Sequence, residues 1–124
     1  MRRRHIGMLA IGAVVVWSGL LVRAGFADEH CREPKTGTRQ IPLFSPPESA
    51  VVTGVGRLQF YSAPNNRCPM RGVFVVPKDA LIAYARSADG WSSVMYLNPR
   101  TGEDVSGWVR SARLKATGTV APRE

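Results

Sequence analysis

From Val51 onward the sequence is a series of short apolar runs, each closed by Gly, Pro, Asn or Asp. Runs of this length, rich in Val, Leu, Ile, Phe, Tyr and Trp and bounded by turn-forming residues, are typical of β-strands. After residue 27, no window longer than one turn spaces its apolar residues at the helical period. We therefore predict an all-β fold, with strands over residues 55–62, 72–76, 80–86, 91–97, 105–110 and 117–120.

The turn residues between these runs predict how the strands connect. Gly90 follows Asp89 between two strands, where glycine adopts a positive φ at little cost, so a hairpin is expected there. A longer loop over residues 98–104 joins two strands that we expect to pair antiparallel. Five to six short strands are too few to form two large packed sheets. We therefore predict a small bent barrel over residues 51–120. An extended arm over 28–50, a helical turn over 111–114 and a tail over 121–124 complete this prediction.

The N-terminus is predicted to be an export signal that is not part of the fold. Three arginines at positions 2–4 precede an uncharged apolar run over residues 6–22, and small residues follow it. This order is that of a secretory signal peptide, so we expect residues 1–27 to be removed after Ala27, or alternatively after Ala24. The competing interpretation is an uncleaved membrane anchor, because the run just reaches the length of a spanning helix.

Export would limit the classes of partner that this basic chain can meet. The formal net charge is +8, and loss of four basic and no acidic leader residues lowers it to +4. A mildly basic protein in the periplasm or outside the cell meets anionic wall polymers, lipid head groups and acidic proteins. Nucleic acid is not an expected partner, and a membrane is one only if the leader stays uncleaved.

The chain has two cysteines, Cys31 and Cys68, and both follow the leader. An even number of cysteines in an oxidising compartment predicts a disulfide. The bridge would tie the arm to a loop 37 positions later and stabilise the fold by about 3–5 kcal/mol. A metal site is the alternative, but His30 is the one histidine left after the leader, so we expect neither a metal nor another cofactor.

Strand alternation predicts which side chains face the core. Val105 and Val109 share one face of their strand, so with these valines inside Trp108 points outward, and Gly107 gives the backbone room to bend. The same reasoning applies to the other strands. It places Leu58, Phe60, Leu81 and Ala83 inside, and Gln59, Tyr61 and Tyr84 outside.

Three outward rings are candidates for a ligand-binding groove. Tyr61, Tyr84 and Trp108 would hold an extended ligand, and Arg110 and Arg113 would face its carboxylates. The alternative is that these rings lie under loops as a second small core, because large aromatic side chains are mostly buried. The arginines can equally belong to a solvated face at one end of the barrel.

The order of GRLQFYSAP, VFVVPKDALIAY, DGWSSVMY and SGWVRSARL resembles bacterial SH3-like domains of the SH3b type. The resemblance covers about residues 55–120 and lies in a Leu–Ser–Pro element, a Lys turn and Gly-Trp pairs that bracket a hairpin. The matching positions are Leu58, Ser62, Pro64, Lys78, Leu81, Gly90, Trp91, Tyr96, Gly107, Trp108, Val109 and Leu114. The resemblance implies an SH3-like barrel that binds cell-wall peptides or peptidoglycan. This chain departs from the family at residues 59–61, where the family has Asn-Val-Arg, and at Ala63 and Asp79, where the family has glycine. Because of these departures, the resemblance does not identify the ligand.

No catalytic constellation is predicted. Glu103 and Asp104 are adjacent acids in a loop, and they lack the burial that adapts paired carboxylates to acid–base catalysis. We therefore expect a non-catalytic exported binding module for a wall peptide, peptidoglycan or an envelope protein. The alternative is an inhibitor or immunity-type protein for a wall hydrolase, with the loop over 98–104 as a plug. A membrane-tethered assembly factor would require the leader to stay attached.

Overall fold

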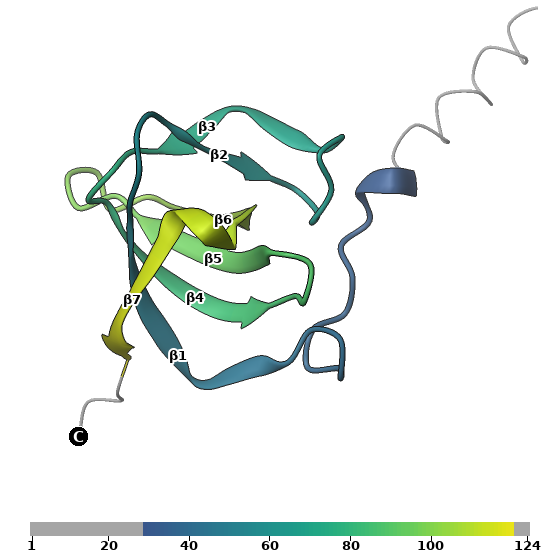
Figure 1. Cartoon of the computed structure of the whole chain (residues 1–124). Coiled ribbons are helices and arrows are strands. Elements are labelled where there is room, and N and C mark those ends of the chain that lie inside the picture. The colour runs from purple at the N-terminus through teal and green to yellow at the C-terminus, as the bar shows by residue number, and fades with distance from the viewer. Residues whose placement is uncertain (1–28, 121–124) are drawn as a thin grey trace, which may run out of the picture. The chain divides into compact units, whose positions relative to one another are not determined.

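A computed structural model describes residues 29–120, and it builds this part of the chain from strands and two short 3₁₀ turns (Figure 1). In chain order the elements are η3 (Glu29–Cys31), β1 (Leu43–Val52), β2 (Leu58–Tyr61), β3 (Pro69–Val75), β4 (Ala80–Arg86), β5 (Trp91–Leu97), β6 (Asp104–Arg110), η4 (Ser111–Arg113) and β7 (Leu114–Thr119). The predicted signal peptide over residues 1–27 and the predicted tail over 121–124 lie outside the described residues.

The seven strands form one antiparallel sheet in the order β3-β2-β6-β5-β4-β1-β7. At its centre β4, β5 and β6 follow one another as a meander. β3 and β7 are the two edges, so strand pairing does not close the sheet into a barrel. The all-β prediction is confirmed, but the sheet has seven strands where five to six were expected.

The turn chemistry predicted from the sequence is present in the structure. β4 and β5 have the expected bounds, and Gly90 between them has a φ of +97°. The helical turn expected before the last strand is η4. The prediction holds for these elements because each is determined by residues that are close to one another in the chain.

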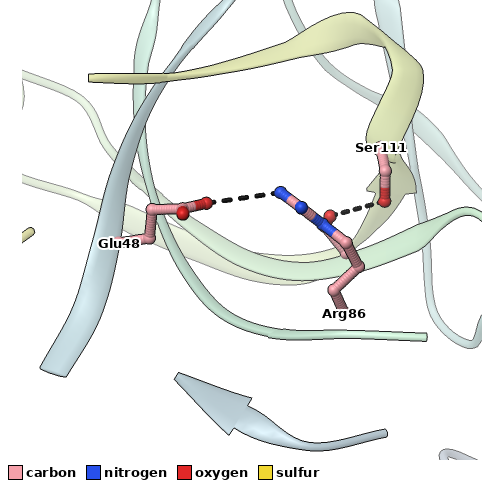
Figure 2. A network of polar contacts seen from close by, with 4 residues as sticks. Glu48, Arg86 and Ser111 are labelled. Carbon is pink, nitrogen blue, oxygen red and sulfur yellow. Dashed lines mark hydrogen bonds and ion pairs between the residues drawn. The ribbon is translucent and has the colours of Figure 1, made fainter. Parts of the chain in front are cut away.

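β1 was not predicted and occupies the second half of the segment expected to be an extended arm. It pairs with β4 on one side and β7 on the other, and its register shifts between Leu43 and Glu48. The shift accommodates Pro46 and Pro47, which cannot donate to a ladder and are tolerated at a bulge. Beyond it, Glu48 accepts a hydrogen bond of 3.3 Å from Arg86 of β4, as Figure 2 shows.

The main core lies on the concave face of the curved sheet. Its buried side chains come from six strands, β1 to β6: Val52, Leu58, Phe60, Val75, Leu81, Ala83, Val94 and Val109. The expected inward positions of β2 and β4 are therefore confirmed. A single core reached from six strands requires the sheet to wrap around it, because a flat sheet would leave most of these side chains in water.

Candidate functional site

A second, smaller core lies on the other face of the central strands. Trp91 of β5 and Trp108 of β6 are buried there together with Ile41 and Ala85, and Tyr61 packs against them. The rings of Tyr61 and Trp91 meet edge to face, with their centroids 4.9 Å apart. Strand alternation was therefore predicted correctly, because Trp108 points away from the core that holds its neighbour Val109.

The N-terminal arm, residues 31–42, makes this aromatic face inaccessible. Ile41 packs into the cluster, and the indole nitrogen of Trp108 donates a hydrogen bond of 2.9 Å to the carboxylate of Glu33. The disulfide between Cys31 and Cys68 holds the start of the arm, with 5.5 Å between the Cα atoms. The predicted disulfide is thus present. The predicted open groove at Trp108 is wrong, because Trp108 is 0% exposed and the cluster is the second small core considered as the alternative.

Gly107 has a packing role that explains why one Gly-Trp pair lies in β6. A Cβ atom built on Gly107 would come within 2.9 Å of both the Phe60 ring and the carbonyl oxygen of Tyr61. β6 therefore lies so close to β2 that no side chain fits between them, and Tyr61 pairs directly with Trp108. Gly107 was predicted to give the backbone room to bend, and its role in the structure is this close approach of two strands.

The two predicted arginines are held by intramolecular contacts. The guanidinium carbon of Arg110 lies 4.0 Å from the centroid of the Trp91 ring, and Arg110 donates a hydrogen bond of 2.6 Å to Asn66. Arg110 therefore covers Trp91 from the solvent side and stays half-buried. A ligand carboxylate reaching Arg110 would meet an arginine already oriented by an aromatic ring.

Arg113 is held against backbone oxygens of the chain itself. Its guanidinium donates to the carbonyl oxygens of Thr53 at 2.6 Å, Gly56 at 2.7 Å and Arg57 at 3.3 Å. These bonds tie η4 to the loop between β1 and β2. Arg113 therefore has a structural role, with three of its N–H donors bound to backbone oxygens, and its predicted contact with a ligand stays a prediction.

Tyr84 lies apart from the other two predicted rings. Its hydroxyl group is 4.0 Å from the sulfur of Met95 in β5. Met95 in turn lines a hollow of about 490 Å³, which we call the outer groove. The groove is lined by Ser49, Ala50, Val51, Ala80, Leu81, Ile82, Met95, Leu97, Thr117 and Val120. Tyr84 thus lies beside an open surface, and Tyr61, which is also half-buried, packs against the second core.

The strand register explains why the outer groove is apolar. Ser49, Ile82 and Met95 are cross-strand neighbours in β1, β4 and β5, so their side chains form a row on one face of the sheet. Leu97 follows at the end of β5 and is 54% exposed. The sequence carried a signal for this surface, because β4 and β5 place apolar residues on both of their faces. Strand alternation did not predict this surface, because alternation assigns one face of each strand to the core and the other to solvent.

Two further hollows continue from the outer groove around the base of the β5–β6 loop. One, of about 330 Å³, shares Ala80 and Leu97 with the groove and adds Pro99. The next, of about 240 Å³, shares Tyr96 with the second and reaches Phe74 in β3. Exposed apolar side chains thus follow one another around this end of the sheet.

The β5–β6 loop itself is ordered by its own hydrogen bonds. The side-chain oxygen of Asn98 accepts from the backbone nitrogens of Arg100 at 2.9 Å and Thr101 at 3.4 Å. The backbone of Asn98 also bonds to Gly102 and Glu103, each at 2.8 Å. These hydrogen bonds connect the two ends of the loop and leave Arg100 exposed at its tip.

The described residues offer no cluster of three or more His, Cys, Asp or Glu side chains that could hold a metal ion. Within the same part of the chain, no helix has the length and apolar character of a transmembrane segment. Comparison with models of known protein families, with curated proteins and with solved structures finds no match for this chain.

Proposed function

We propose that this protein is an exported, non-catalytic binding module of the SH3-like type that recognises an extended peptide in the bacterial envelope. The outer groove is the observation that carries the proposal. It is the largest hollow described above, it is lined from β1, β4, β5 and β7, and it ends at the exposed side chain of Leu97. Apolar grooves of this size on a rigid sheet suit an extended ligand whose side chains enter separate hollows.

Four further features support this proposal. The Cys31–Cys68 disulfide is compatible with an oxidising compartment, in agreement with the expected export. The SH3-like interpretation is supported by the curved antiparallel sheet, the central meander and the helical turn before the last strand. The source of the peptide is either a peptidoglycan stem or an envelope protein.

The proposal is tested by retention on purified peptidoglycan and by capture of envelope proteins. Leu97→Gln should lower retention or capture at least several-fold, because it places an amide in the apolar groove. Leu43→Gln is the matched control, since Leu43 is 55% exposed, against 54% for Leu97, and lies outside the groove. Equal retention of wild type and Leu97→Gln would show that the groove is not the site, and no retention of wild type in either assay would reject the function.

A second candidate function is inhibition of a wall hydrolase by the β5–β6 loop. It is favoured by the preorganised loop, because a loop fixed before binding loses little conformational entropy on inserting into a cleft. A lysozyme-type activity assay tests it. Inhibition that weakens in Asn98→Ala, which releases the loop, would support this function, whereas undiminished hydrolase activity in the presence of wild-type protein would remove it.

A further inference from the structure

The hollow between β3 and the β5–β6 loop combines aromatic walls with an acidic rim, and we call it the acidic hollow. Its volume of about 240 Å³ suits one long side chain. Its lining residues are Gly72, Val73, Phe74, Tyr96, Asn98, Glu103, Asp104 and Val105. Rings enter it from β3 and β5, and carboxylates enter it from the loop and the start of β6.

The two carboxylates of this hollow are unusual on a basic protein. The chain has a net charge of +8, yet Glu103 and Asp104 are both exposed and adjacent. Within residues 29–120 the one ion pair joins Arg86 to Glu48, and neither Glu103 nor Asp104 has a hydrogen-bonding partner for its side chain. The rim of this hollow therefore carries two carboxylates that no ion pair within residues 29–120 neutralises.

The Phe74 ring already attracts a cation in the folded chain. The guanidinium carbon of Arg57 lies 4.2 Å from the centroid of this ring. Arg57 does not line the hollow, and the Phe74 side chain keeps 38% of its surface exposed. Tyr96 adds a second, half-buried ring to the same walls. Aromatic faces beside free carboxylates are the combination that selects an organic cation over a hydrated metal ion.

We propose that the acidic hollow binds a lysine-type side chain of the peptide that the module recognises. The methylene stem lies against Phe74 and Tyr96, and the ammonium group is bound at the carboxylates of Glu103 and Asp104. This inference rests on the proposed function and deepens it, because it assigns a positively charged residue to the peptide. The outer groove and the acidic hollow then bind two different residues of one peptide.

The test is an NMR titration of the exported chain, labelled with ¹⁵N, with two capped tripeptides. Acetyl-Ala-Lys-Ala-amide should shift the amide signals of Phe74, Asn98 and Glu103, whereas acetyl-Ala-Gln-Ala-amide should not. The double variant Glu103→Gln/Asp104→Asn should weaken binding of the lysine peptide at least tenfold. Phe74→Ala should weaken it about fivefold, because the methylene stem loses the aromatic wall against which it lies.

The control is Asp89→Asn, which removes an exposed carboxylate from the β4–β5 turn and should leave the affinity unchanged. All four folded proteins are first compared by circular dichroism and melting temperature. Equal responses to the lysine and glutamine peptides, or unchanged affinity in the double variant, would overturn the inference.

The peptidoglycan and capture assays separate this inference from the proposed function. If the double variant is retained as well as wild type while Leu97→Gln is not, binding at the outer groove stands and the lysine site is rejected. If wild type binds the lysine peptide through the two carboxylates but neither wall material nor any envelope protein, the site stands and the proposed function falls.

Discussion

The indole nitrogen of Trp108 donates a 2.9 Å hydrogen bond to Glu33, a residue 75 positions earlier in the chain. A buried indole needs a partner for its N–H group, and the arm supplies one together with the apolar cover from Ile41. The arm therefore completes the fold, because it changes the outer face of β5 and β6 into a second core.

Replacing Glu33 should destabilise the protein through this bond. Glu33→Ala should lower the free energy of unfolding by about 1–2 kcal/mol, because the buried indole loses its acceptor. Glu33→Gln keeps an acceptor oxygen and should lose less. Urea unfolding followed by tryptophan fluorescence measures both, with Lys35→Ala as an exposed control in the same arm. Equal stability of wild type and Glu33→Ala would show that the hydrogen bond contributes nothing.

Removing the disulfide should have a larger effect. The double variant Cys31→Ser/Cys68→Ser frees a loop of 37 residues in the unfolded chain and should lower the free energy of unfolding by about 3–5 kcal/mol. Its tryptophan emission should shift to longer wavelength if the arm loosens over Trp91 and Trp108. The same urea titration of the wild-type protein under a dithiol reductant is the matched experiment, and an unchanged midpoint there would contradict the expectation.

Gly107→Ala should disturb the contact between β6 and β2. The added methyl group would lie 2.9 Å from the Phe60 ring and from the Tyr61 carbonyl oxygen, and backbone cannot yield as a flexible side chain does. We expect a loss of about 1–3 kcal/mol in thermal or urea unfolding. Ser106→Ala, at the exposed neighbouring position, should change stability by less than about 0.5 kcal/mol. Comparable stabilities for the two variants would reject the close-approach role of Gly107.

Arg113→Lys tests whether the guanidinium is structural. A lysine cannot reach the carbonyl oxygens of Thr53, Gly56 and Arg57 together, so stability should fall by about 1–2 kcal/mol. Arg100→Lys at the exposed loop tip keeps the charge and should be neutral. Hydrogen exchange of the β1–β2 loop should increase in Arg113→Lys alone, and unchanged protection there would show that the loop is held by other contacts.

The sequence predicted the parts of this protein that depend on near neighbours in the chain. Alternation of apolar residues assigned Leu58, Phe60, Leu81 and Ala83 to the core, and turn residues placed the β4–β5 hairpin and η4. β1 escaped prediction because its two prolines argue against a strand, and the bulge that accommodates them depends on its pairing with β4.

The candidate site was predicted less well than the fold. Tyr84 and Arg110 remain at the surface, but Trp108 is covered and Arg113 is bound to backbone oxygens. Leu97, Phe74 and Met95 were not proposed, although each lines a hollow. Alternation states which side of a strand a residue occupies, and it cannot state whether another segment covers that side.

By itself the sequence determined that this chain is all-β, that its two cysteines pair, and that Trp108 and Val109 point in opposite directions. Those properties follow from local backbone preference, an even number of cysteines and the two-residue period of a strand. Only the tertiary structure decided that the arm covers the tryptophans and that the far end of the sheet stays open. The arm covers the tryptophans through contacts between residues that are distant in the chain, namely the Cys31–Cys68 bridge and the Glu33–Trp108 hydrogen bond. No local sequence pattern encodes such contacts.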